Sequence, residues 1–139
     1  MAGIIDNAIT RLQQIALECA PVKSAPQQPP ESAAVLPVSV AHIVSGNGEV
    51  QSRGEVQMIL NIGVDIHVNM QTLKSAYDQM NTIIPAYLKR LAGDPTLNSS
   101  VATIVYPVTF EIVATQWNTT PTLMAGFTVP IKFREDTIE

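Results

Sequence analysis

The sequence predicts an α+β fold in which two helices pack on one face of a four-stranded, mainly antiparallel sheet, in the order α-β-β-α-β-β. Two observations indicate this fold: two segments have apolar residues at helical spacing, and four segments alternate apolar and polar residues as half-buried strands do. Because each strand has one apolar face, both helices can cover the same side of one sheet. The length of 139 residues suits a single domain over residues 1–139.

The first helix is predicted over residues 4–18, where apolar side chains recur every three or four positions until Pro21 ends the pattern. Residues 21–33 hold four prolines, so we expect an extended loop with polyproline character. This loop lacks a P-x-x-P core with basic flanks, which favours a spacer over a ligand for another domain.

The first hairpin is predicted from two alternating segments, residues 34–44 and 56–68. The second segment is the clearest strand of the chain because its apolar residues occupy every even position. The apolar faces of the two strands match when paired residue numbers add to an even value, as with Val40 opposite Leu60.

The second half of the chain repeats this order. Residues 71–91 have helical spacing, and the following "GDPTL" predicts a helix exit, with Gly93 as a left-handed cap. Residues 102–112 and 122–133 alternate and predict a hairpin that pairs Phe110 with Phe127. The same register places two prolines opposite each other, at positions 107 and 130, so we expect a bulge or a free edge nearby. The charged residues 134–139 predict a flexible tail.

The composition limits the function. Charged residues make up 14% of the chain, well below the usual level of about 25%. Because interface cores are depleted in charge, we expect partners to cover part of the surface. The net charge is −4 and the eight Lys and Arg residues are dispersed, which argues against a phosphate-gripping surface. We also expect a soluble protein made in a cytoplasm, because the sequence contains neither a signal peptide nor an apolar run long enough for a membrane span.

The residues that could carry chemistry favour a protein that is not an enzyme. Cys19 lies on the apolar stripe of the first helix, which predicts a small buried side chain rather than a nucleophile. His42 is predicted on the apolar face of its strand and His67 on the polar face of the next, so we expect them on opposite sides and not at one metal. The glycine-bearing loop 45–54 lacks the Lys-Ser/Thr ending of a phosphate loop. We therefore expect no catalytic residue, no cofactor and no metal.

Several polar residues are candidates for contacts with a partner. Asp65 and His67 lie two apart on one strand face and could form a hydrogen-bonded pair at an interface. Glu49 and Arg53 lie in the loop of the first hairpin, from which they could reach a neighbour. Trp117 lies at the tip of the last hairpin, where a Trp either packs back onto its own domain or anchors a partner.

The chain resembles the tail terminator proteins of long-tailed bacteriophages, which are also called tail completion proteins. The resemblance is carried by the stretch "YLKRLAGDPTLNSSVATIVYPVT", by "ILNIGVDIHVN" before the second helix, and by the last strand "MAGFTVPIKFRE". It covers roughly residues 35–134, and "GDPTL" is its only short motif. The proline-rich loop 21–33 departs from the family pattern.

The resemblance implies a structural role in the virion. Proteins of this family form hexameric rings that cap the tail tube, stop its polymerisation and join the tail to the head connector or stopper protein. The expected partners are therefore other copies of the chain, the major tail tube protein and the connector, with DNA passing through the lumen without specific binding. An acidic balance suits such a passage. On this reading Glu55, Asp65 and Glu111 are candidate carboxylates of the lumen or of an interface.

Two other functions stay open. The chain could be a different ring or tube component of the tail and neck, such as a tail tube subunit or a head completion protein. It could also be a small ligand-binding or enzymatic α+β domain, which would be a monomer or dimer with a concave polar pocket.

Overall fold

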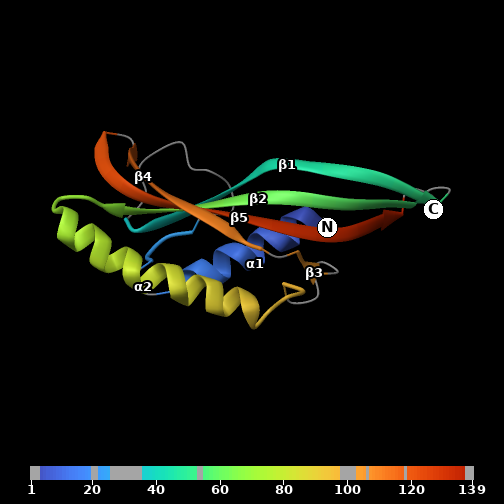
Figure 1. Cartoon of the computed structure of the whole chain (residues 1–139), viewed down its shortest axis with the longest axis horizontal. Coiled ribbons are helices and arrows are strands. Elements are labelled where there is room, and N and C mark those ends of the chain that lie inside the picture. The colour runs from blue at the N-terminus through green and yellow to red at the C-terminus, as the bar shows by residue number, and fades with distance from the viewer. Residues whose placement is uncertain are drawn as a thin grey trace.

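The computed structural model describes residues 4–19, 22–25, 36–52, 55–97, 103–105, 107–117 and 119–136. It has an α+β fold with two helices and one antiparallel five-stranded sheet. The helices are α1 (Ile4–Glu18) and α2 (Leu73–Ala92), and both lie on the same face of the sheet (Figure 1). The fold class, the antiparallel sheet and the two helices were predicted, whereas the number of strands was not.

The two helices match their sequence patterns closely. α1 covers the predicted range, and α2 begins two residues later than predicted, after the side chain of Thr72 caps it by accepting a hydrogen bond from the Ser75 N–H at 3.1 Å. The exit from α2 differs from the prediction. Gly93 has a right-handed conformation with φ of −83°, and the left-handed residue is Leu97, with φ of 48° and a fully buried side chain.

Tyr87 joins the two helices to the sheet. Its ring is fully buried and its centroid lies 4.8 Å from that of Phe127 on the sheet. Its hydroxyl donates a hydrogen bond to the carbonyl of Leu12 in α1 at 3.3 Å. Burial strongly raises the pKa of this hydroxyl, so it remains a donor across the physiological pH range.

The first hairpin consists of β1 (Val38–Ser52) and β2 (Glu55–Asn69), and its predicted register is wrong. Val40 lies opposite Asp65, and Ala41 lies opposite Val64. The even-numbered residues of β1 before the bulge therefore face away from the helices, and the odd-numbered ones face them. A bulge between Ile43 and Ser45 then shifts the pairing by one residue.

A hydrogen-bonded polar pair explains why the sequence pattern predicts the wrong core face for β1. Ser39 is fully buried beneath α1, where its hydroxyl donates to Gln13 Oε1 at 2.7 Å. Gln13 Nε2 in turn donates to the Ser39 carbonyl at 2.9 Å. Two hydrogen-bonded polar residues thus occupy a core position where an apolar pair was expected.

The second hairpin has the predicted register but one more strand. β5 (Thr120–Asp136) pairs with β4 (Thr109–Trp117), and Phe110 lies opposite Phe127 as predicted. The chain before β4 leaves the ladder and forms a separate short strand, β3 (Thr103–Ile104), shifted by two residues on β5. The break falls at the facing prolines, where the sequence predicts an interruption.

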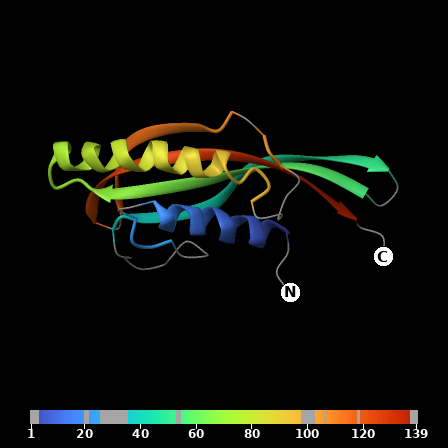
Figure 2. The same ribbon diagram turned by 90° about the horizontal axis from the view of Figure 1, so that it is seen from below.

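The long strands continue past the helices as an arm. Figure 2 shows β1, β2 and β5 running beyond the ends of α1 and α2. β5 remains paired with β2 as far as Asp136, so its last three residues extend into the segment that the sequence predicted as a flexible tail. The proline-rich loop is described only at residues 22–25, and positions 26–35 lie outside the described residues.

We expect Gln13→Ala to lower the free energy of unfolding by about 2–3 kcal/mol, because it removes two buried hydrogen bonds and leaves the Ser39 hydroxyl without its acceptor. The matched control is Gln14→Ala, at the exposed neighbouring position of the same helix. This control should change stability by less than about 0.5 kcal/mol. Urea unfolding measures both, and equal losses for the two variants would contradict the role given to the Gln13–Ser39 pair.

Candidate functional site

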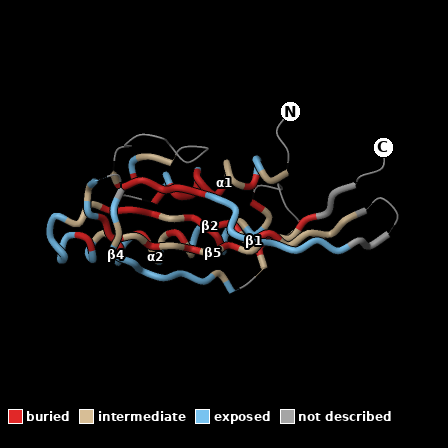
Figure 3. Tube along the Cα trace, turned by 90° about the horizontal axis from the view of Figure 1, so that it is seen from above, coloured by how far each residue is buried: buried red, intermediate tan, exposed pale blue. Residues whose placement is uncertain are grey.

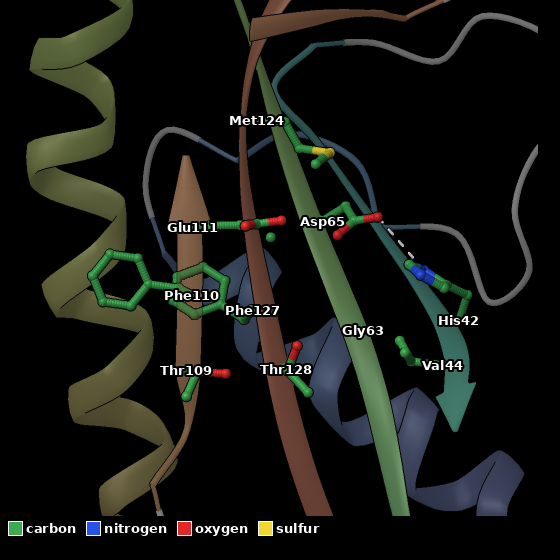
Figure 4. Close-up of a pocket in the computed structure, with 11 residues that line it drawn as sticks. His42, Val44, Gly63, Asp65, Thr109, Phe110, Glu111, Met124, Phe127 and Thr128 are labelled. Carbon is green, nitrogen blue, oxygen red and sulfur yellow. Dashed lines mark ion pairs between the residues drawn. The ribbon is translucent and has the colours of Figure 1, made fainter. Parts of the chain in front are cut away.

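The sheet face opposite the helices, here called the open face, contains a hollow of about 450 Å³. At the position of the hollow, two adjacent rows of cross-strand partners run across the four long strands β1, β2, β5 and β4. The rows are His42–Gly63–Thr128–Thr109 and Val40–Asp65–Gly126–Glu111. Figure 4 shows that the hollow extends from His42 and Val44 on β1 to Thr109 and Glu111 on β4.

Two glycines make room for the polar groups of the hollow. A Cβ atom at Gly63 would lie 2.8 Å from two atoms of the His42 ring and 2.9 Å from a Val44 methyl carbon. A Cβ atom at Gly126 would lie 3.2 Å from Asp65 Oδ1. Since such approaches are too close or very tight for a carbon atom, the His42 ring depends on the missing side chain of Gly63.

Asp65 and His42 form the polar centre of the hollow. His42 Nδ1 lies 3.5 Å from Asp65 Oδ2, and Glu111 points across β5 toward Asp65 (Figure 4). Burial raises the pKa of the Asp65 carboxyl; the nearby His42 opposes this rise and the Glu111 carboxylate adds to it. The hollow is thus a site where negative charge is already unfavourable, and a cationic group would relieve it.

His67 lies on the same face but forms a different contact. It is buried opposite Val38, and its Nδ1 lies 3.0 Å from the Thr122 hydroxyl oxygen. Burial lowers the pKa of the His67 ring from its usual 6.5. The predicted Asp65–His67 pair is therefore replaced by His42–Asp65 and His67–Thr122, and the prediction that the two histidines face opposite sides is wrong.

The remaining candidate residues are dispersed. Glu49 is exposed on β1, in the arm. Glu55 and Trp117 are placed in β2 and β4, but their side chains lie outside the described residues, as does Arg53 altogether. Among the candidates whose side chains are described, only Asp65 and Glu111 share the hollow.

The two outer strands of the sheet are exposed along much of their length (Figure 3). Residues 42–49 of β1 and 109–114 of β4 are all exposed. They include five large apolar side chains: Ile43, Val44, Phe110, Ile112 and Val113. The sequence did not single out these two edges, because it did not predict the pairing of β2 with β5 that makes β1 and β4 the outer strands.

His42 and the two glycines were also missed as site residues. The sequence signal for them is that Gly63 and Gly126 lie inside strongly alternating strands, where glycine marks a close approach by another group. Identifying His42 additionally requires the correct register of β1.

Metal and nucleophile chemistry receives little support from the described part of the chain. Within these residues, no three His, Cys, Asp or Glu side chains gather so as to hold a metal ion. Cys19 is buried as predicted, and its thiol donates to the Ile15 carbonyl at 3.3 Å. Burial raises the pKa of this thiol, which disfavours the reactive thiolate. In the same described ranges, neither helix is both long and apolar enough to cross a membrane.

Comparison with known proteins gives no family assignment. No protein-family model matches the chain, and no curated protein matches it.

The burial of His67 predicts a loss of stability in acid. Because its folded-state pKa is lowered, its contribution is complete above the unfolded-state value of 6.5 and is lost as the pH falls toward the folded-state value. Between about pH 7.5 and 5.5, wild type should therefore lose more stability than His67→Gln does. Urea unfolding at both pH values measures this difference, which should persist in a His42→Gln background. Parallel pH profiles for wild type and His67→Gln would show that His67 is not the group responsible.

Gly63→Ala should displace the His42 ring from Asp65 while changing stability by no more than about 1 kcal/mol, since alanine is favoured over glycine in a strand. NMR chemical shifts of the His42 ring report the displacement. The matched control is Gly48→Ala on β1 outside the hollow, where the closest atom to the added Cβ is 3.5 Å away and the His42 shifts should not change. Unchanged His42 shifts in Gly63→Ala would contradict the packing described here.

Proposed function

We propose that this chain is a structural tail assembly protein of a long-tailed bacteriophage. In this role it forms a six-fold ring that caps the tail tube, stops its polymerisation and joins the tail to the head connector. The location of the assembled protein would be the neck of the virion, after synthesis in the host cytoplasm.

The observation that carries the proposal is the open face. Both helices cover one side of the sheet, and the other side is hollowed and lined by Asp65 and Glu111. Beside His42 and His67, Lys132 is the only basic residue among the described side chains of the hollow's strands that the alternation places on this face, and no described Arg lies there. A hollowed face that is acidic and poor in cations suits the lining of a channel, because a basic lining would hold passing DNA electrostatically.

The arm supports contacts along the axis of such a ring. It extends beyond both helices, and the exposed residues 44–49 of β1 form one side of it. A projecting sheet segment with an exposed edge is suited to reach a tube subunit or a connector, because an extended segment of a partner can pair with such an edge.

The volume of the hollow favours one other function, a small ligand-binding domain. Ligand pockets commonly measure about 300–1,000 Å³, and the hollow falls within this range. Such pockets are lined mainly by apolar and aromatic side chains. This hollow is lined by glycines, hydroxyls and carboxylates beside apolar and aromatic residues, so we retain ligand binding as the second candidate. The apolar and aromatic lining residues are Val44, Phe110, Met124 and Phe127.

The proposal predicts that the purified chain stops the growth of tail tubes. Tube subunits of the cognate phage should polymerise to shorter tubes in its presence, and electron microscopy should show a ring at one end. Native mass spectrometry should give about six copies of the chain, alone or on the tube. A monomer that neither binds tubes nor limits their length contradicts the proposal.

Charge reversal tests the channel lining. The triple variant Glu55→Lys, Asp65→Lys, Glu111→Lys should lose assembly or infectivity, because it places cations around the path of the DNA. The matched control is Asp78→Lys on the exposed surface of α2, which breaks only an exposed pair with Lys74. Full assembly and infectivity of the triple variant would exclude a lumen or interface role for these carboxylates.

A further inference from the structure

Among the described residues, both outer strands of the sheet have long exposed stretches. Exposed aliphatic side chains lie along both edges: Ile43 and Val44 are 52% and 53% exposed on β1, and Ile112 and Val113 are each 39% exposed on β4. Neither strand contains a Lys, an Arg or a Pro, and each has a single carboxylate, Glu49 on β1 and Glu111 on β4, as a charge that could oppose edge-to-edge pairing. The register of β1 shifts at Val44 and again between Val50 and Ser52, and such irregularities oppose regular pairing at an edge.

The free part of the β1 edge begins at His42. Before that point, the Ser39 N–H donates to the carbonyl of Ser24 at 2.8 Å, and Ala41 is buried. Beyond it, residues 42–49 are exposed, and within the described residues only Ser24 forms a bridge to the outer edge of β1. The β1 edge is thus paired with Ser24 at its start and exposed from His42 onward.

The two edges are complementary in direction. The sheet runs β1, β2, β5, β4 across the hollow, and every neighbouring pair is antiparallel. β1 and β4 therefore run in opposite directions. If a second copy is placed beside the first in the same orientation, its β4 lies antiparallel to β1 of the first copy, as a continuing antiparallel sheet requires.

The hydrogen-bonding groups are also complementary. The Ser39 N–H points away from β2, so by alternation the backbone groups of Ile43 also point outward. The same alternation continues across β2 and β5 to β4. There the backbone N–H and C=O groups of Phe110 and Ile112 point outward, away from β5. The side chains of all three lie on the helix face, so they would meet on one side of a continued sheet.

From these observations we infer that the free edge of β1 pairs antiparallel with β4 of a second copy, so that each copy uses two different edges. The contact places Ile43 of one copy opposite Phe110 or Ile112 of the next. This inference adds an interface to the proposed function. A contact between two different surfaces gives either a closed ring or an open filament, so the closure of the ring rests on the proposed function.

The pairing would also join the hollows of neighbouring copies. If Ile43 pairs with Phe110, His42 of one copy lies opposite Glu111 of the next on the open face. If Ile43 pairs with Ile112 instead, His42 lies two residues away from that position. The polar groups of successive hollows would then form one continuous band around the ring.

Disulfide trapping tests the inference in a Cys19→Ala background. Ile43→Cys is combined with Phe110→Cys or with Ile112→Cys, because directly paired residues have Cβ atoms about 4.5–5.5 Å apart, within reach of a disulfide after a small adjustment. One of the two double variants should give a ladder of covalent oligomers on oxidation. The three single variants should form no covalent oligomers, while a mixture of the Ile43→Cys variant with the matching β4 variant should stop at covalent dimers.

The strands themselves exclude an intramolecular bond. β2 and β5 separate the two edges within one copy, which places them about 14 Å apart. The oxidation is carried out on the isolated protein and on the protein bound to tail tubes, so that a ring that closes only on its partner is still detected.

Each outcome decides between named alternatives. Cross-linking of the Ile43→Cys variant alone would indicate a symmetric β1–β1 contact, and the absence of ladders from both double variants in both conditions would overturn the inference. If tube growth still stops in that case, the proposed function stands and only the interface is wrong. If ladders form without any effect on tubes, the interface stands and the proposed function is wrong.

Lysine substitution provides a second measurement. Ile43→Lys and Ile112→Lys should each weaken self-association by about tenfold or more, because a charge on an edge opposes strand addition. The control is Leu73→Lys, which replaces another exposed aliphatic side chain, at the start of α2. Equal effects of all three substitutions would show that the edges have no special role.

Discussion

The strict alternation of β5 is the constraint on which the rest of the structure depends. This strand pairs with β2, β3 and β4, and its odd-numbered residues from Leu123 to Phe133 are buried on the helix side. Phe127 at its centre contacts the rings of Tyr87 and Phe110, at centroid distances of 4.8 Å and 5.7 Å. Because a strand has a period of two, the same alternation places Gly126 and Thr128 on the open face. The core and the hollow are thus two consequences of one pattern.

The sequence predicts the fold where that pattern is unbroken and fails where a polar pair interrupts it. α1, α2 and the Phe110–Phe127 register follow from uninterrupted periodicity. The register of β1 does not follow from periodicity. Ser39, opposite Ile66, takes the core position through its hydrogen bonds with Gln13, while Val38 and Val40 are buried on the open face. The alternation of apolar residues therefore assigns the first part of β1 to the wrong side, and the error moves every residue before the bulge to the opposite face.

The same error determines which part of the candidate site was predictable. Asp65 and Glu111 could be named from the sequence, because both are carboxylates on the polar side of well-predicted strands. His42 could not, since its position beside Asp65 exists only in the observed register, with Gly63 directly opposite it. Contacts across strands depend on register, and register depends on the buried Gln13–Ser39 pair rather than on any feature of the site itself.

The bulge at Val44 bears on whether neighbouring copies would form a ring or a fibre. Two exposed, complementary edges on one sheet would promote open-ended growth if the strands could pair along their whole length. On β1, the Ser24 bridge occupies the edge on one side of His42, and the bulge shifts the pairing on the other. Only a short stretch then remains for regular pairing, and a bulge bends the strand and increases its local twist. A short, bent contact turns each copy relative to the last, and this rotation is what allows a chain of identical contacts to close.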